Sequence, residues 1–184
     1  MKKISSKYRH LVVAALIAAV LIFVDQLSKR IIVLTIPYSP YGSEVYYVIP
    51  YLFNVTHVRN TGAAFSIGAD SSAAMTVFIV LTFVCLAAII FALVRWGTRS
   101  RLLFASLCVI FAGAAGNLID RLTNIDESGR RYVVDFIRFT FWPEFACFNF
   151  ADICVCVGAV MFVVYFLFID GRIEKKKAGE KKNG

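Results

Sequence analysis

The sequence is poor in the residues and spacings from which metal and phosphate sites are built. It contains two histidines, His10 and His57, which lie far apart in the chain, so a histidine-based metal site is not expected. No glycine-rich phosphate loop occurs. The five cysteines show no CxxC spacing. Cys85 and Cys108 lie in apolar stretches, where cysteine usually serves as a small hydrophobe. A disulfide through Cys147 is allowed by the sequence but not required. These absences leave carboxylates and side-chain amides as the groups best able to carry chemistry.

Hydrophobic residues, in contrast, are abundant. They make up 59% of the 184 residues, and the mean hydropathy is +0.72, whereas a soluble domain is typically about 45–50% apolar. The excess lies in blocks of about 20 residues, the length that crosses roughly 30 Å of hydrocarbon. The sequence therefore predicts a mainly α integral membrane protein. The spans leave too little chain for an independent soluble domain, so we expect one domain over residues 1–184.

Four blocks are predicted to form transmembrane helices, at about 11–34, 73–94, 102–119 and 153–169. The first block begins like a signal peptide, but it runs into Asp25 and Gln26 rather than a small-residue cleavage site, so we interpret it as a retained helix. Residues 70–72, Asp-Ser-Ser, suit the N-cap of the second helix. The run AGAAG at 112–116 would let the third helix approach its neighbours closely.

The basic residues indicate how these helices are oriented. They form three groups at alternate ends of the hydrophobic blocks: Lys2, Lys3, Lys7 and Arg9; Arg95, Arg99 and Arg101; and the tail from Arg172 to Lys182. This distribution is typical of the positive-inside rule, and it predicts both termini, including the basic tail 171–184, in the cytoplasm. Loops 35–72 and 120–152 would then be extracytoplasmic. Despite the net charge of +8, no nucleic-acid partner is expected, because basic patches of that kind come with a recognisable fold or motif.

The two long loops predict short strands. Residues 51–60 mix β-branched, aromatic and polar side chains, and the run 132–139 follows the turn signal at 126–129. Phe139, Phe141 and Trp142 suit an aromatic belt at the membrane interface. We therefore expect a small extracytoplasmic β platform on the four-helix membrane domain.

Polar residues concentrate near the predicted outer ends of the spans. They occur in four short runs: NTGAAFS (60–66), GNLIDR (116–121), VVDF (133–136) and FNFAD (148–152). Asn117 and Asp120 are three residues apart, as are Asn149 and Asp152, so each pair shares a face if the segment is helical. Ionisable residues at membrane depth are costly and usually functional. We expect these runs to form one polar site.

Two aspartates are the candidates for chemistry at this site. Asp152 would lie at a helix start, where the helix dipole favours a carboxylate, and Asp135 would lie at an apolar rim, where desolvation and a nearby like charge raise a carboxyl pKa. One protonated and one ionised carboxyl can activate water, as in aspartic proteases. The alternatives are that Asp152 is only a helix N-cap and that Asp135 is only a surface charge at a strand end.

Several neighbours are predicted to support the site. Asp25 and Lys29 have the spacing and order of a favourable helical ion pair. Arg121 either pairs with Asp120 or extends to the membrane rim. Gly62 either permits close backbone approach or simply forms a turn.

Five runs taken in order, DQLSK (25–29), NTGAAFS, GNLIDR, VVDF and FNFAD, resemble the bacterial lipoprotein signal peptidase (signal peptidase II) family over about residues 20–160. The resemblance implies an inner-membrane aspartic endopeptidase without metal or other cofactor. Such an enzyme removes the signal peptide from diacylglyceryl-modified prolipoproteins by cutting just before the lipidated cysteine. It also implies an extracytoplasmic β-cradle, contact with membrane lipid and sensitivity to globomycin-type inhibitors. The implied catalytic residues are Asp135 and Asp152, supported by Asp25, Asn60, Asn117, Asp120, Arg121 and Asn149.

The sequence departs from this family at one position and leaves two other functions open. Ile153 stands where the family often has serine after the second catalytic aspartate. Segment 124–131 and the tail after Asp170 carry no assigned role. A small transporter would use the acidic residues as an ion path. A metal-dependent lipid phosphotransferase would hold Mg²⁺ on the cluster Asp120, Asp135, Asp152, Asn117 and Asn149.

Overall fold

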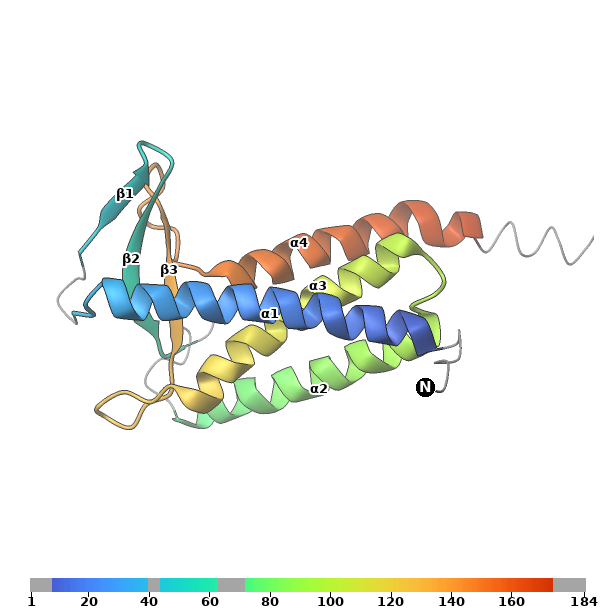
Figure 1. The fold of residues 1–184 in the computed structure, drawn as a ribbon, viewed down its shortest axis with the longest axis horizontal. Coiled ribbons are helices and arrows are strands. Elements are labelled where there is room, and N and C mark those ends of the chain that lie inside the picture. Colours follow the sequence, from blue (N-terminus) through green and yellow to red (C-terminus); the bar gives the residue numbers. More distant parts are fainter. Residues whose placement is uncertain (1–7, 40–43, 63–71, 174–184) are drawn as a thin grey trace, which may run out of the picture.

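The computed structural model describes residues 8–39, 44–62 and 72–173, which form a bundle of four long helices with a small sheet at one end (Figure 1). The helices are α1 (Arg9–Thr35), α2 (Ser72–Trp96), α3 (Arg101–Thr123) and α4 (Phe150–Val164), and α4 continues into a π-helical segment, η3 (Tyr165–Asp170). All four are long and apolar enough to cross a membrane, with mean hydropathies of 2.1 to 3.2. The predicted mainly α, multi-pass membrane fold is confirmed, whereas the direction in which it crosses the membrane stays a prediction.

Local signals explain where the helices begin and end. No proline lies inside a helix, and α1 stops at Thr35, just before the extended residue Ile36 that precedes Pro37. Ser100 caps α3 by accepting a hydrogen bond from the Leu102 amide at 3.2 Å. Helix α4 begins at residue 150, three residues before the predicted start, so Asp152 lies in its first turn. The cap predicted at residues 70 and 71 lies outside the described residues.

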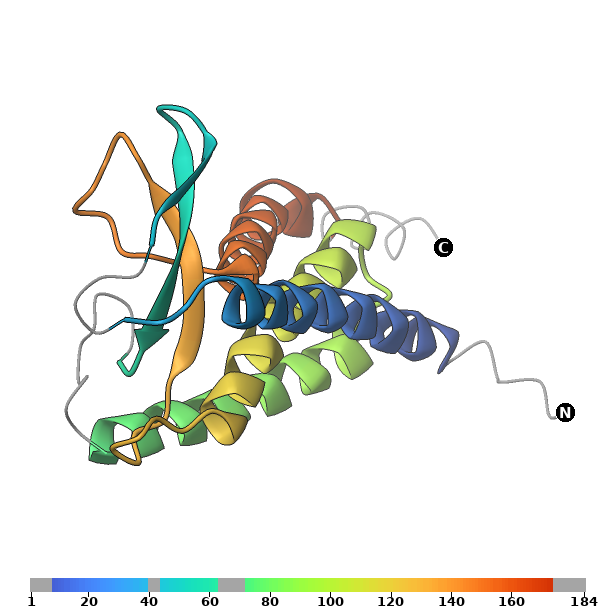
Figure 2. The ribbon, with the colours of Figure 1, turned by 60° about the vertical axis from the view of Figure 1, so that its left-hand side comes forward.

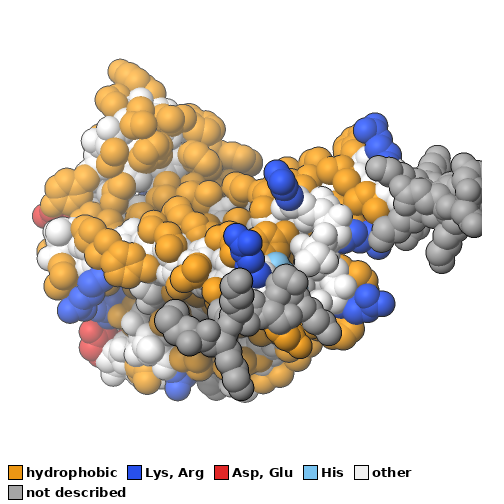
Figure 3. All heavy atoms as spheres, turned by 45° about the vertical axis from the view of Figure 1, so that its right-hand side comes forward, with side chains coloured by type: hydrophobic (Ala, Val, Ile, Leu, Met, Phe, Trp, Pro, Cys, Tyr) orange, Lys and Arg blue, Asp and Glu red, His pale blue; other side chains and the backbone are white. Residues whose placement is uncertain are grey.

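Helix α3 is the centre of the bundle. Half of its most apolar stretch is buried, compared with 11–17% for the other three helices. The outer helices instead expose large apolar side chains such as Leu16, Phe91 and Phe166, and hydrophobic side chains cover much of the face in Figure 3. An apolar outer surface around a buried helix is what a lipid-facing bundle requires, because hydrocarbon replaces water as the solvent.

Two glycines of α3 let its neighbours approach closely. A Cβ atom on Gly113 would lie 2.4 Å from the Ala151 carbonyl oxygen of α4, and one on Gly116 would lie 2.5 Å from an Asp25 carboxylate oxygen of α1. Neither approach is compatible with a side chain at that position. The predicted role of the run 112–116 in close helix packing is therefore confirmed.

The sheet contains β1 (Tyr46–Ile49), β2 (Phe53–Asn60) and β3 (Val133–Phe139) in antiparallel order β1-β2-β3. It stands across the end of the bundle with β3 next to the helices (Figure 2). Buried apolar residues of α1 and β3 pack together there: Ile32, Ile36, Val134 and Phe136. In the register, Val58 faces Asp135 and Asn60 faces Val133, so the last residue of β2 lies beside the polar segment of β3.

The interior of the bundle divides into an apolar half and a polar half. Away from the sheet, the core consists of Ala14, Leu93, Leu103, Leu107, Cys108 and Tyr165. Near the sheet, an apolar cluster lies beside buried residues that are charged or amide-bearing: Asp25, Lys29, Asn117, Asp120, Asp135 and Asn149. The tertiary structure thus gathers the polar runs of the sequence at one end of the molecule.

Candidate active site

Asp135 and Asp152 line one cavity of about 600 Å³ beneath the sheet. Asp135 comes from the middle of β3, and Asp152 comes from the first turn of α4. Asn60, Asn117 and Arg121 line the same cavity. The structure therefore brings together residues that are up to 92 positions apart in the sequence (60 and 152).

Asp135 is almost completely buried, with 2% of its surface exposed. Its carboxyl accepts a hydrogen bond from Asn60 Nδ2 at 2.8 Å and another from Asn149 Nδ2 at 2.6 Å. Burial, and to a smaller extent the negative charge of Asp152, raise the pKa of Asp135 to about 7 against the opposing effect of the two amide hydrogen bonds. The Asp135 carboxyl thus exchanges its proton near neutral pH, where a general acid or base works best.

Asp152 is held by a capping box at the start of α4. Asn149 is the N-cap: its side-chain oxygen accepts from the Asp152 amide at 3.0 Å, and Asp152 Oδ2 accepts from the Asn149 amide at 3.0 Å. The cap is therefore Asn149 rather than Asp152. Asp152 Oδ1 accepts from Asn117 Nδ2 at 2.8 Å. Because Asn149 also donates to Asp135, this one side chain bridges the two aspartates.

A buried lysine lies at the base of the site. Lys29 Nζ lies 2.9 Å from Asp25 Oδ2, 3.1 Å from Asp120 Oδ2 and 2.9 Å from Asn117 Oδ1. The predicted Asp25–Lys29 pair is present, and it extends to a second carboxylate. An ammonium group can only donate, so the Asn117 oxygen must face Lys29. This orientation turns the Asn117 amide nitrogen toward Asp152.

The two carboxylates that pair with Lys29 also anchor the backbone beside each catalytic candidate. Asp25 Oδ1 accepts from the amide of Ala151 at 3.0 Å, and Asp120 Oδ2 accepts from the amide of Val134 at 3.1 Å. Ala151 precedes Asp152, and Val134 precedes Asp135. The lysine cluster therefore fixes the backbone from which both aspartates project.

Gln26 completes this cluster, and it was missed in the sequence analysis as a site residue. Its Nε2 lies 3.0 Å from Asp25 Oδ2, 3.2 Å from the Gly116 carbonyl oxygen and 2.9 Å from Asp120 Oδ1. The available signal was a polar side chain next to Asp25 inside an apolar block.

Arg121 and Gly62 take roles that the sequence left open. Asp120 pairs with Lys29, and no ion pair joins it to Arg121 within the described ranges. Arg121 instead faces the cavity, and its Nη1 lies 3.3 Å from the Asn117 carbonyl oxygen. Gly62 is buried, and its amide donates to Asn60 Oδ1 at 3.0 Å, which leaves the Asn60 nitrogen free to donate to Asp135. Residues 63–66 of the same run lie outside the described part of the chain.

The remaining walls of the cavity are largely apolar. They include Val133, Phe139, Phe145, Phe148, Ile153, Val155 and Val157, and Thr82 of α2 also contributes. The rings of Phe139, Phe145 and Phe148 pack together, with the Phe139 centroid 5.3 and 5.2 Å from the other two. Ile153 therefore adds to the apolar lining.

Cys147 also lines the cavity, but its environment does not suit a nucleophile. Burial raises the pKa of this thiol to about 12, and the charges of Asp135 and Asp152 act in the same direction. The thiol therefore stays protonated at neutral pH, whereas the thiolate is the reactive form.

Metal ions in proteins are held by groups of several ligand side chains. Across 8–39, 44–62 and 72–173, no three His, Cys, Asp or Glu side chains are grouped as metal ligands. The cation between the carboxylates of Asp25 and Asp120 is the ammonium of Lys29. The arrangement instead provides two carboxyls, held by amides, on one wall of an apolar cavity.

Comparisons with known proteins agree on one family. The family model described as signal peptidase (SPase) II matches residues 17–168. A lipoprotein signal peptidase from Borreliella afzelii is 39% identical over 81% of this chain and 86% of its own length, and one from Enterococcus faecalis is 35% identical over 96% and 98%. A solved structure of a bacterial membrane enzyme superposes with a TM-score of 0.72 at 31% identity, covering 85% of this chain and 94% of that one. A match of this extent places the chain in the signal peptidase II family of membrane peptidases.

Proposed function

We propose that this protein is an aspartic endopeptidase that removes the signal peptide from diacylglyceryl-modified prolipoproteins, cutting just before the lipidated cysteine. The observation that carries the proposal is the pair Asp135 and Asp152 in one cavity, joined through Asn149. Their surroundings differ, since Asp135 is deeply buried and Asp152 is only half-buried. Different surroundings give the two carboxyls different pKa values, so that one can be protonated while the other is ionised. Acid–base catalysis by such a pair requires this difference.

The chemistry follows from this asymmetry. The carboxylate of the pair takes a proton from water, and the hydroxide adds to the scissile carbonyl carbon while the protonated carboxyl donates a hydrogen bond to the carbonyl oxygen. The tetrahedral intermediate then breaks its C–N bond as a proton passes to the leaving nitrogen. The raised pKa of Asp135 favours it as the protonated member near neutral pH, although the two carboxyls titrate as a pair.

The cavity also suits a lipid-modified substrate. Its apolar walls would accommodate acyl chains or signal-peptide side chains, and each buried CH₂ contributes about 0.8 kcal/mol. A substrate with two acyl chains would therefore be cut much faster than the same precursor without lipid. Globomycin-type inhibitors would compete for this cavity.

The location of the site in the membrane is inferred from charge. Arg9, Arg95, Arg99 and Arg101 lie at the end of the bundle opposite the sheet (Figure 1). Basic residues favour the cytoplasmic side, and we therefore infer that the aspartates lie at the extracytoplasmic side of the bacterial inner membrane. A lipidated precursor would present its scissile bond near that interface.

The test is cleavage of a diacylglyceryl-modified prolipoprotein by the purified, full-length protein, with and without EDTA. Wild type should cut in both conditions, and Asp135→Asn and Asp152→Asn should each be inactive while still folded. Asp126→Asn is the matched control, because Asp126 lies in the exposed turn and contacts Arg130 and Ser128. It should cut like wild type.

Other outcomes would point to a different function. Loss of cutting in EDTA would mean that the oxygen cluster holds a metal needed for the reaction, and near-normal activity of either aspartate variant would reject the pair. An ion path is disfavoured by the apolar cluster that fills the other half of the bundle in the described structure. Proton flux in liposomes without peptide cleavage would reverse that conclusion.

A further inference from the structure

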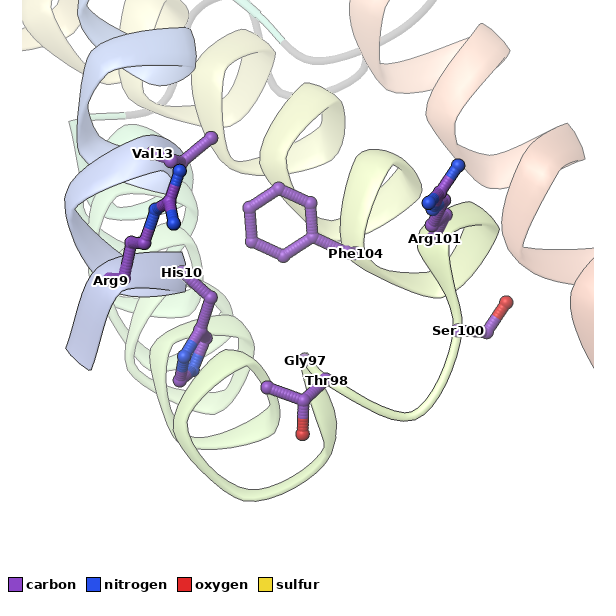
Figure 4. A pocket seen from close by; sticks show the side chains of 8 residues that line it. All are labelled: Arg9, His10, Val13, Gly97, Thr98, Ser100, Arg101 and Phe104. Carbon is purple, nitrogen blue, oxygen red and sulfur yellow. The ribbon is translucent and has the colours of Figure 1, made fainter. Parts of the chain in front are cut away.

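A second cavity lies at the end of the bundle opposite the aspartates, between α1, α3 and the turn that joins α2 to α3 (Figure 4). Its volume is about 380 Å³. Arg9, His10 and Val13 of α1 line one side, and Arg101 and Phe104 of α3 line the other. The proposed peptidase reaction uses none of these residues.

The polar part of this cavity is positively charged. Arg9 and Arg101 are exposed and come from different helices, and neither has an ion-pair partner among the residues that the structure describes. Arg99 nearby is already engaged, since its Nη2 lies 3.0 Å from Asp170 Oδ1. Lys and Arg side chains gather at this end of the molecule in Figure 3. A guanidinium group without an ion-pair partner is suited to a phosphate, which it can bind through paired hydrogen bonds.

The other part of the cavity is apolar. In Figure 4, the ring of Phe104 reaches into the space between α1 and α3, with Arg9 on one side and Arg101 on the other. Val13 is 40% exposed beside it and continues into the exposed apolar surface of α1 at Leu16 and Val20. A ligand with a phosphate at one end and a hydrocarbon chain at the other would match both parts.

His10 and Gly97 close the inner side of the cavity. A Cβ atom on Gly97 would lie 2.4 Å from the Leu93 carbonyl oxygen and 3.4 Å from His10 Cδ2, so the imidazole packs directly against the turn. His10 Nε2 is shielded from water and has no hydrogen-bond partner within the described ranges. His10 therefore forms a closed part of the cavity wall rather than a contact for the ligand.

We propose that this cavity binds one phospholipid, with its headgroup at the arginines that flank the cavity, Arg9 and Arg101, and an acyl chain along Val13 and Phe104 between them. The site is separate from the cavity of Asp135 and Asp152, and the proposal does not depend on the peptidase mechanism. Its ligand is a structural lipid rather than a substrate, because no carboxyl or thiol group lines this cavity.

The experiment is native mass spectrometry of the full-length protein in detergent, titrated with phosphatidylglycerol. Wild type should retain one lipid, and the double variant Arg9→Gln/Arg101→Gln should bind it at least about tenfold more weakly. Arg95→Gln is the matched control, because Arg95 is an exposed arginine in the last turn of α2 that does not line the cavity. It should bind like wild type. Arg9→Lys/Arg101→Lys keeps the charge and should lie between the two.

Two further ligands show how much of the lipid affinity comes from the phosphate and how much from the acyl chains. Diacylglycerol with the same acyl chains lacks the phosphate and should not be retained, and inorganic phosphate should not displace the bound lipid at equal concentration. The proposal fails if diacylglycerol binds as well as phosphatidylglycerol, if inorganic phosphate alone occupies the site, or if Arg95→Gln weakens binding as much as the double variant. Equal unfolding midpoints of the variants without added lipid would show that the difference is in binding and not in folding.

Discussion

At the scale of single residues, side-chain amides set the state of the two aspartates. Asn60 and Asn149 donate to Asp135, while Asn117 and the Asn149 backbone donate to Asp152. A hydrogen bond donated to a carboxylate favours its ionised form, so each amide opposes the rise in pKa that burial causes. The balance between these effects gives Asp135 a pKa of about 7.

Replacing Asn60 with leucine should therefore move the pH dependence of cleavage. Asp135 is protonated below its pKa, so activity that needs this proton is lost as the pH rises through about 7. Asn60→Leu removes a donor, raises the pKa further and should shift this alkaline limb to higher pH, with a lower maximal rate. Asn54→Leu, on the same strand without a hydrogen bond to Asp135, is the control. A limb that stays in place or moves to lower pH would contradict the assignment.

Lys29 has an equally specific role, because it neutralises two buried carboxylates. Lys29→Met would leave Asp25 and Asp120 without a cation, and breaking a buried ion pair in this way costs about 3–5 kcal/mol. We expect a large loss of unfolding free energy in detergent micelles. Adding Asp25→Asn and Asp120→Asn to the same chain should recover part of that loss. If Lys29→Met alone unfolds like wild type, the carboxylates are not held by this lysine.

At the scale of elements, the polar site depends on how closely α1, α3 and α4 approach one another. Gly116 lets the Asp25 carboxylate lie against α3, and Gly113 lets α3 lie against the Ala151 carbonyl of α4. These contacts bring Asp25 within hydrogen-bonding distance of the Ala151 amide. Helix spacing and active-site geometry are thus set by the same two glycines.

Adding one methyl group to Gly116 should consequently disturb both stability and cleavage. Its Cβ would lie 2.5 Å from Asp25 Oδ2, so the ion pair or the helices must move, and overpacking of this kind costs about 1–3 kcal/mol. Gly171→Ala is the control, since a Cβ there has no neighbour within 4 Å. Unfolding and cleavage of both variants should be compared in the same micelles. If Gly116→Ala unfolds and cleaves substrate like Gly171→Ala, close packing at Gly116 is not required for stability or for cleavage.

At the scale of the whole molecule, the candidate site carries a stability cost that depends on pH. In an unfolded chain the pKa of an aspartate is about 4, whereas the pKa of Asp135 in the folded protein is about 7. The protonated Asp135 carboxyl therefore contributes its full stabilisation below about pH 4, and this contribution is lost as the pH rises through about 7. An ionised Asp135 next to Asp152 is a cost that the remaining contacts of the fold must offset.

Asp135→Asn removes this cost and should stabilise the protein at neutral and higher pH. Its unfolding free energy, relative to wild type, should rise between about pH 4 and about pH 7, by up to about 4 kcal/mol. Asp126→Asn should instead lower the unfolding free energy at neutral pH. Hydrogen bonds from the Arg130 and Ser128 backbone hold the pKa of Asp126 low, so that carboxylate stabilises the fold above its pKa and loses its effect only in acid. Chemical unfolding of the three proteins across this pH range is the measurement.

The sequence was sufficient for the fold class and for naming most of the residues that the structure gathers at the candidate site. Long apolar blocks, an i, i+4 ion pair at Asp25 and Lys29, and the polar runs around Asn117 and Asp152 all depend on local spacing, which the chain displays directly. The roles of Gln26 and Arg121 were not predictable in this way. Gln26 contacts Asp120, which lies 94 positions away in the sequence. Among the described residues, Arg121 forms no ion pair with the adjacent Asp120, because the Asp120 carboxylate pairs with Lys29.

What the sequence by itself determined is therefore the membrane-spanning pattern, the concentration of polar residues near one end and the identity of two candidate catalytic aspartates. These features follow from hydrophobic periodicity and from the high cost of placing charge in hydrocarbon. Only the tertiary structure decided which amide faces which carboxyl, that Asn149 bridges Asp135 and Asp152, and that an arginine-lined cavity forms at the far end. Those features arise from contacts between helices and strands distant in sequence, and their geometry is set by packing rather than by local spacing.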